Sequence, residues 1–309
     1  MAADEGSIHP VGDPRAAQSK TESTTTALVP LRLPPLADPD PEPEPVDKAR
    51  RGDVDEWGRS ERVRGWVRKA YDPMYRNWFR AEWEGLDKIP TEGGALLVAN
   101  HAGAIPSDAP TIMHGIETEL KRPLYGLADH FFKATPVVGT LWSRGGGVVA
   151  HPDNAYRLLR EQQQLVLVFP EGSKGPGKTY NERYRLRRFG RGGFVEIAMR
   201  AGVPIIPIAV VGAEESMPIL FKVPSVAKAL GAPYFPVTAN MALGPLGALV
   251  PFPAKFKLRV LDPVTFPDVE PDQPRYSRSR IMDESEAIRQ QIQEALFDML
   301  RQRRSVWFG

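Results

Sequence analysis

The sequence predicts an α/β fold with a largely parallel central sheet flanked by helices. Short apolar runs alternate with longer amphipathic runs along most of the chain, as strands alternate with helices in such folds. One run, residues 165–169, is apolar at every position, which is typical of a strand covered on both faces. We therefore expect a layered domain whose sheet is buried between helices.

Six apolar runs are the expected strands, at residues 95–99, 124–127, 147–150, 165–169, 205–211 and 256–261. The amphipathic runs are the expected helices, at residues 109–120, 153–163, 192–201, 225–230 and 284–304. Pro204 and Pro207 lie at the start of the run at 205–211, and proline cannot donate a ladder hydrogen bond. That run is expected to be an edge strand or to begin irregularly.

Two segments precede these elements. Residues 1–54 are expected to be a disordered tail, because nine of the chain's 31 prolines lie in the first 50 residues beside many acidic ones. Residues 55–84 are an expected helical segment, broken at Pro73, in which aromatic and basic residues are interleaved. This segment suits a membrane interface, and it equally suits a helix that caps the domain with its aromatic rings in the core.

The overall composition excludes several classes of protein. The formal net charge is only +2, so we expect no nucleic-acid partner. The absence of cysteine excludes disulfides, thiolate metal sites and a cysteine nucleophile, and we expect no metal. No signal peptide and no run of 18 apolar residues occur, and the apolar stretch at 239–254 is broken by glycine and proline. We expect a cytoplasmic protein that associates peripherally with the inner face of the cell membrane.

A histidine and an aspartate stand at the end of the first expected strand. His101 follows that strand directly, a turn containing glycine comes next, and Asp108 opens the following helix after Ser107. An imidazole can accept a hydroxyl proton near neutral pH, and a carboxylate on its other nitrogen orients it and stabilises the imidazolium. The alternatives are an aspartate that serves only the helix N-terminus and a histidine that is only a loop residue.

Two later segments carry further candidate residues. Phe169, Pro170, Glu171, Gly172, Ser173 and Lys174 end the apolar run at 165–169. A glutamate, a glycine and a cation at a strand end suit ligand positioning, and they equally suit a simple turn. Residues 174–191 then hold seven basic residues, Arg188 and Arg191 among them, against one acid. This cluster suits the phosphates of CoA, an acidic carrier protein or anionic lipid, unless it is only a solvated face. His114 and His130 are interpreted as structural.

Together, in this order, these segments resemble the glycerolipid acyltransferase family, the PlsC-like lysophosphatidic-acid acyltransferase group, over roughly residues 83–263. The residues that carry the resemblance are Asn100, His101 and Asp108, the Phe-Pro-Glu-Gly segment at 169–172, the Val-Pro-Ile-Ile-Pro segment at 203–207 and the glycine-containing segment at 188–193. The resemblance implies that residues 85–309 are one O-acyltransferase domain.

The resemblance also implies a mechanism. His101 deprotonates the hydroxyl of a lipid acceptor, Asp108 orients the histidine, and the oxygen attacks the thioester of acyl-CoA or an acyl-carrier protein. No covalent acyl-enzyme, cofactor or metal is implied. Backbone amides near Gly103 or Gly172 are candidates for stabilising the oxyanion. The implied substrate-binding residues are Phe169, Pro170, Glu171, Gly172, Ser173, Lys174, Arg188 and Arg191. Arg144 is a further candidate, although it lies upstream of the position at which the family carries an arginine.

The chain departs from the family pattern at two places. Six residues separate His101 from Asp108 where four are commonest, which resembles a longer-spaced branch. The arginine that binds a glycerol phosphate is replaced by His151 or Pro152, and Arg144 lies upstream of that position. The acceptor is therefore open. It is a lysophospholipid or other glycerolipid, or a neutral diacylglycerol, long-chain alcohol or glycolipid. A non-catalytic lipid- or acyl-CoA-binding protein is the third alternative.

Overall fold

The computed structural model describes residues 52–105, 107–128, 138–229, 234–273 and 275–309. These residues belong to one compact unit, Lys48–Gly309. Apart from residues 52–54, the expected tail lies outside the described residues, and so does His130.

The central sheet has seven strands in the order β1-β9-β6-β2-β5-β3-β4. In chain order they are β1 (Glu82–Glu84), β2 (Ala95–Ala99), β3 (Leu124–Ala128), β4 (Gly147–Val149), β5 (Leu165–Val168), β6 (Ile205–Val211) and β9 (Lys257–Val260). Strands β2 to β6 are parallel to one another, whereas β9 is antiparallel to β6 and β1 is parallel to β9. The predicted α/β class with a largely parallel sheet is confirmed.

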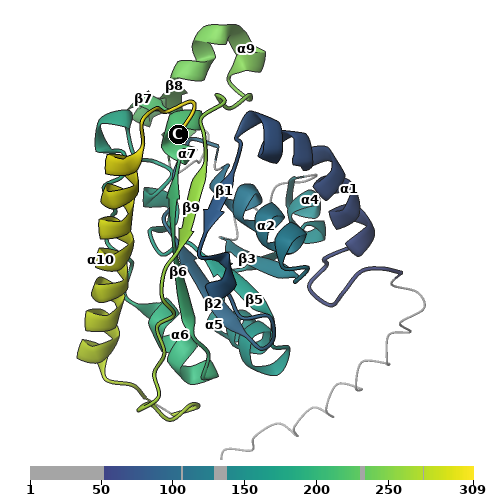
Figure 1. Ribbon diagram of the computed structural model, residues 1–309, viewed down its shortest axis with the longest axis vertical. Coiled ribbons are helices and arrows are strands. Elements are labelled where there is room, and N and C mark those ends of the chain that lie inside the picture. Colours follow the sequence, from purple (N-terminus) through teal and green to yellow (C-terminus); the bar gives the residue numbers. More distant parts are fainter. Residues whose placement is uncertain (1–51, 106, 129–137, 230–233, 274) are drawn as a thin grey trace, which may run out of the picture. The chain divides into compact units, whose positions relative to one another are not determined.

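Helices cover both faces of this sheet (Figure 1). The α-helices are α1 (Glu61–Pro73), α2 (Asp108–Glu119), α4 (Val138–Arg144), α5 (Pro152–Tyr156), α6 (Gly193–Ala201), α7 (Ala213–Ser216), α8 (Pro224–Ala229), α9 (Gly244–Gly247) and α10 (Arg278–Gln302). Two π-helical turns, η2 (Met74–Trp78) and η4 (Arg157–Glu161), extend α1 and α5. Short 3-10 turns are η3 (Leu86–Lys88), η5 (Gly172–Lys174), η6 (Tyr180–Glu182) and η7 (Ala239–Leu243).

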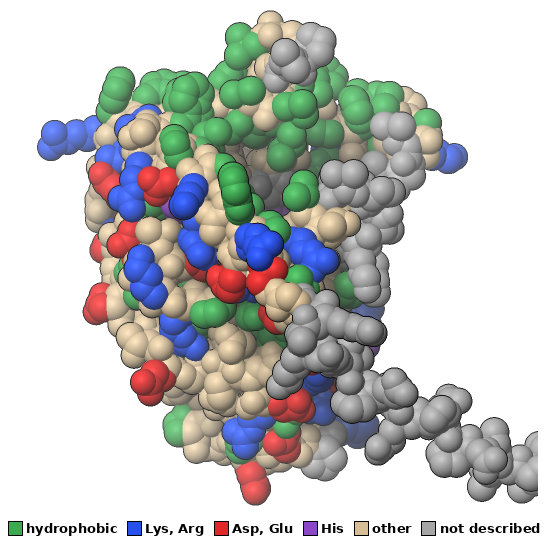
Figure 2. Space-filling view, turned by 90° about the vertical axis from the view of Figure 1, so that its right-hand side faces the viewer, with side chains coloured by type: hydrophobic (Ala, Val, Ile, Leu, Met, Phe, Trp, Pro, Cys, Tyr) green, Lys and Arg blue, Asp and Glu red, His purple; other side chains and the backbone are tan. Residues whose placement is uncertain are grey.

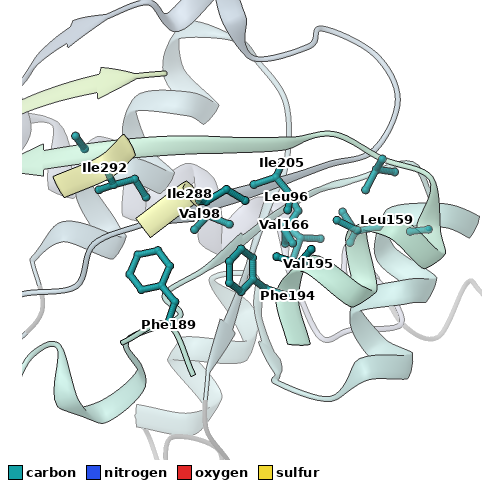
Figure 3. Packing of buried hydrophobic residues seen from close by; sticks show 14 of the residues in the cluster. Leu96, Val98, Leu159, Val166, Phe189, Phe194, Val195, Ile205, Ile288 and Ile292 are labelled. Carbon is teal, nitrogen blue, oxygen red and sulfur yellow. The ribbon is translucent and has the colours of Figure 1, made fainter. Parts of the chain in front are cut away.

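Strand β2 contributes side chains to the hydrophobic cores on both faces of the sheet. Its side chains alternate between the faces of the sheet, as the pleat requires. Leu96 and Val98 lie in the core that α6 and α10 cover (Figure 3). Leu97 and Ala99 lie in the second core, with Phe79 and the buried residues of α2. All five residues of β2 are buried, so this strand fixes the position of the residues that directly follow it.

The expectation that residues 205–211 form an edge strand is wrong, because β6 lies between β9 and β2. The position tolerates proline because β9 pairs only with residues 208–211. Pro207 lies just outside those pairs, where its carbonyl accepts the Leu261 amide at 2.9 Å and only the proline N–H is missing.

The aromatic residues of segment 55–84 mostly pack into the domain. The helix begins only at Glu61, where the Ser60 side chain accepts from the Val63 amide. Tyr75 and Phe79 are buried, and Trp57, Tyr71 and Trp83 are half-buried. Trp66, at 73% exposure, and Trp78, at 39%, are the strongly exposed aromatics of the segment. The core-packing interpretation therefore describes most of this segment.

Candidate active site

The predicted motifs meet at one edge of the sheet. Because β2 and β5 are parallel neighbours, His101 after β2 and Phe169 after β5 leave the sheet side by side. Asn100 fixes the end of β2 to β6. Its side-chain amide donates to the Val210 carbonyl at 3.0 Å, and its Oδ1 accepts from the Val210 amide at 2.7 Å.

His101 and Asp108 are in direct contact. His101 Nδ1 lies 2.9 Å from Asp108 Oδ2, and the Asp108 side chain is fully buried. The same carboxylate accepts the Ala102 amide at 2.8 Å and, through Oδ1, the Ala109 amide at 2.7 Å. Asp108 thus accepts an amide of the first turn of α2 and contacts the histidine at once, so a spacing of six residues still allows the His101–Asp108 contact.

A ring on one side completes the orientation of the imidazole. Phe169 stacks on His101 with centroids 4.0 Å apart and planes 18° apart. With Nδ1 engaged by Asp108, Nε2 is the nitrogen that can take a proton from a ligand, and no described residue hydrogen-bonds to it. His101 remains 16% exposed, so a ligand can reach it. This arrangement suits general-base catalysis.

Glu171 is placed beneath the histidine. Its buried carboxylate accepts the His101 amide at 3.1 Å and the Arg187 amide at 2.8 Å. It also pairs with buried Lys178 at 3.2 Å. These bonds tie the His101 turn to the loop after β5, so Glu171 positions other residues instead of facing a ligand.

Lys178 is a residue whose importance the sequence did not indicate. It lies within the basic run at 174–191, yet it is buried between Glu171 and Glu214, whose Oε1 is 3.1 Å from Nζ. Burial is the main cause that raises the pKa of Glu214 to about 7. Arg303 pairs with neighbouring Glu215 at 2.9 Å. A charge run alone cannot reveal which of its cations is buried, because the partners come from distant segments.

The turn after Phe169 is tightly packed. Gly172 has φ +57° and its amide donates to the Phe169 carbonyl at 2.9 Å, so this amide is already engaged within the turn. A Cβ on Gly175 would lie 2.8 Å from His101 Cβ and 2.9 Å from its carbonyl oxygen. Pro170 is half-buried and Lys174 is exposed, and the side chain of Ser173 lies outside the described part of the structure.

The predicted arginines lie in two different places. Arg144 precedes β4, at the sheet edge opposite His101, and its guanidinium donates to the Gly58 carbonyl at 3.3 Å. Because the strands are parallel, Arg144 and His101 lie at opposite ends of the strands, and a role of Arg144 in binding the acceptor stays a prediction. Arg188 and Arg191 are exposed on the loop that leads to α6. His151 caps α5, where its Nδ1 accepts the Asp153 amide.

Comparisons with known proteins give the family of this chain. A model of the family described as Acyltransferase matches residues 80–211. An uncharacterized protein of Mycobacterium tuberculosis (strain H37Rv) is 39% identical over 249 residues, which are 79% of this chain and 68% of that protein. The chain belongs to the acyltransferase family, as the resemblance predicted.

Two further proteins are similar over different shares of their length. A human protein named "DGAT1/2-independent enzyme synthesizing storage lipids" is 31% identical over 145 residues, 46% of this chain and 43% of that protein. The crystal structure of the 1-acyl-sn-glycerophosphate acyltransferase PlsC from Thermotoga maritima is 18% identical, with a TM-score of 0.48 over 79% of this chain and 80% of that one.

The described residues also bear on metals and membranes. They contain no group of three histidine, aspartate or glutamate side chains arranged to hold a metal ion. None of the helices in the same part of the chain has the length and apolar character needed to cross a bilayer.

Proposed function

We propose that this protein transfers a fatty acyl group from a thioester, acyl-CoA or an acyl-carrier protein, to the hydroxyl of a glycerolipid such as a lysophospholipid. The observation that carries the proposal is the 2.9 Å contact of His101 Nδ1 with the buried carboxylate of Asp108. That contact leaves Nε2 to act as the general base. A non-catalytic binding protein would not need such a pair.

The proposed reaction balances without a cofactor or a metal. Nε2 of His101 takes the hydroxyl proton while the oxygen attacks the thioester carbonyl, and Asp108 stabilises the imidazolium that forms. The tetrahedral intermediate then expels the thiolate, which recovers the proton from His101. One ester bond forms and one thioester bond breaks, and the histidine returns to its starting state.

A neutral lipid alcohol or diacylglycerol is the second candidate acceptor. Two observations favour it: Arg144 is engaged at the opposite edge of the sheet, and a relative is named for storage-lipid synthesis. For the donor, exposed Lys174, Arg188 and Arg191 are cations that phosphates of CoA or an acidic carrier protein would attract. We place the reaction at the cytoplasmic face of the cell membrane, where both lipid substrates would be met.

The test is a transfer assay with radiolabelled palmitoyl-CoA and, in parallel, palmitoyl carrier protein. The acceptors are lysophosphatidic acid, lysophosphatidylcholine, diacylglycerol and hexadecanol. We expect labelled ester product with at least one acceptor. Product with lysophosphatidic acid alone would support a phosphate-bearing acceptor, and product with diacylglycerol or hexadecanol alone would support the second candidate. Absence of ester product with every donor and acceptor pair would overturn the proposal.

A further inference from the structure

Within residues 217–254, the described residues, 217–229 and 234–254, form an apolar lobe that projects beside the site. It comprises β7 (Ile219–Lys222), α8, β8 (Pro236–Thr238), η7 and α9, and β7 pairs with β8 outside the central sheet. Leu243 is 68% exposed, Leu249 66% and Phe221 55%, and Leu220 and Val250 are exposed as well. Figure 2 shows the apolar side chains gathered along the top of the molecule, where Figure 1 places this lobe. An apolar surface of this kind marks a contact with a partner or a membrane.

The charges of the lobe fit a lipid surface. No aspartate or glutamate occurs between Glu215 and Asp262, whereas Lys222 and Lys228 lie inside the lobe. Exposed leucine and phenylalanine next to lysine, without any carboxylate, are suited to burial among acyl chains beneath anionic headgroups. The same absence of carboxylates leaves the lysines without acidic partners if two copies of the lobe faced each other.

The lobe is joined directly to the turn that carries His101. The Ala104 amide donates to the Met217 carbonyl at 3.4 Å, and the Ser107 and Ser216 hydroxyls lie 2.9 Å apart. Ile105, in the same turn, is 48% exposed. The apolar surface therefore continues from the lobe to the residue that lies four positions after His101.

Aromatic residues from two other segments extend this surface. Trp78 donates from Nε1 to the Pro251 carbonyl at 2.9 Å, and Trp307 packs edge-on against Phe252 with centroids 6.4 Å apart. Trp78 and Trp307 are both partly exposed, and Phe308 is almost fully exposed. Partly exposed tryptophan rings are enriched at membrane–water interfaces, where one part of the ring meets apolar surroundings and another meets polar ones.

We propose that the apolar lobe, residues 217–254, docks on an anionic lipid surface and holds the His101 turn at the level of the headgroups. The membrane contact considered for residues 55–84 is thus assigned mainly to the lobe, because most aromatic rings of that segment pack into the core. A lipid substrate would reach His101 along Ile105 without leaving the bilayer. The proposal deepens the proposed function, on which its purpose rests, although binding to lipid is measurable without turnover.

The test is cosedimentation with vesicles of phosphatidylcholine containing 0 or about 30% phosphatidylglycerol, a range in which anionic attraction is strong. The double variant Leu243→Asp/Leu249→Asp should lose affinity by about tenfold or more, since each leucine no longer enters the bilayer. The controls are Trp66→Asp on α1, whose exposure of 73% is close to that of the two leucines, and Phe297→Asp on α10, where an apolar side chain is 47% exposed. Both controls should bind as the wild type does.

Several outcomes would overturn the proposal. The first is that the wild type binds neither kind of vesicle, and the second is that the double variant binds as the wild type does. The third is that Trp66→Asp is the one variant that loses binding. Concentration-dependent dimers that the double variant abolishes would assign the lobe to a second copy instead. Leu243→Ser/Leu249→Ser, with its unfolding midpoint measured beside the wild type, repeats the test without added charge.

A vesicle-free assay separates this proposal from the proposed function. With a short-chain acyl-CoA and a monomeric acceptor, the double variant should turn over at the wild-type rate and lose activity only on vesicles. If neither protein turns over while vesicle binding still depends on Leu243 and Leu249, the proposed function fails and the docking surface stands. If the double variant is equally slow in both assays, docking is not the role of the lobe.

Discussion

At the scale of single residues, burial of the aspartate distinguishes His101 from other histidines. His114 lies 3.2 Å from Asp72 and His151 lies 3.6 Å from Asp153, so a nearby aspartate is common among the described histidines. The side chains of Asp72 and Asp153 are 40% and 69% exposed, whereas that of Asp108 is fully buried. Burial among amides keeps the Asp108 carboxylate fixed on the imidazole, which a solvated aspartate cannot do.

The cluster beneath the site predicts a pH effect on stability. Glu171, Glu214 and Glu215 face two buried cations, Lys178 and Arg303, and burial raises the pKa of Glu214 from 4.5 to about 7. Between pH 4.5 and 7 the folded state therefore holds a proton that the unfolded state releases. This contribution to the free energy of unfolding is full below pH 4.5 and is lost as the pH rises through 7.

Replacing Glu214 with glutamine should remove that loss. Urea unfolding between pH 4.5 and 7.5 should show the stability of Glu214→Gln gaining on that of the wild type as the pH rises, whatever the offset at pH 4.5. Glu196→Gln, at an exposed position of α6, is the matched control and should run parallel to the wild type. A Glu214→Gln curve that also runs parallel would show that this carboxyl does not titrate in the range.

At the scale of elements, the sequence predicted those with a clear periodicity. The six expected strands and five expected helices are all present, with ends shifted by a few residues, because apolar period and burial agree in them. Strands β1, β7 and β8 were missed. β1 and β8 are three residues each, and three of the four residues of β7 are exposed, so none of them carries a buried run that a sequence pattern can show.

Gly175, directly after η5, lies against His101, which follows β2, and this contact predicts the effect of adding a methyl group at Gly175. A Cβ on Gly175 would lie 2.8 Å from His101 Cβ and 2.9 Å from its carbonyl oxygen, so Gly175→Ala must shift one of the two segments, and we expect the histidine to move. We expect a kcat lower by about tenfold or more, with stability reduced by about 1–3 kcal/mol. Steady-state kinetics and thermal unfolding measure the two effects.

The control for this substitution is Gly65→Ala. Gly65 lies within α1, where an added Cβ meets no atom within 4 Å. This variant should keep its kcat and gain up to about 1 kcal/mol of stability from helix propensity. Equal kcat in Gly175→Ala and the wild type would mean that the loop yields and that His101 is not held by this contact.

At the scale of the whole molecule, the sheet explains why the motifs could be found in the sequence and the charge cluster could not. His101 and Phe169 follow strands, and the ends of parallel strands share one edge, so the topology brings them together. Lys178 pairs with Glu214, and Arg303 pairs with Glu215, through packing of segments far apart in the chain. No local sequence pattern marks such pairs. The lobe within 217–254 likewise shows in the sequence only as an apolar stretch broken by glycine and proline, and its exposure becomes evident only in the structure.

The most direct measurement is the acyl-transfer rate of His101→Ala beside His151→Ala. Each variant removes one histidine that has an aspartate within 4 Å, but only His101 lies on a buried carboxylate at the strand edge. With the acceptor that the wild type uses, His101→Ala should lose about a hundredfold or more in kcat/KM, as loss of a general base does. His151→Ala should stay within about twofold of the wild type. A His101→Ala variant as active as His151→Ala would contradict the assignment of His101 as the base.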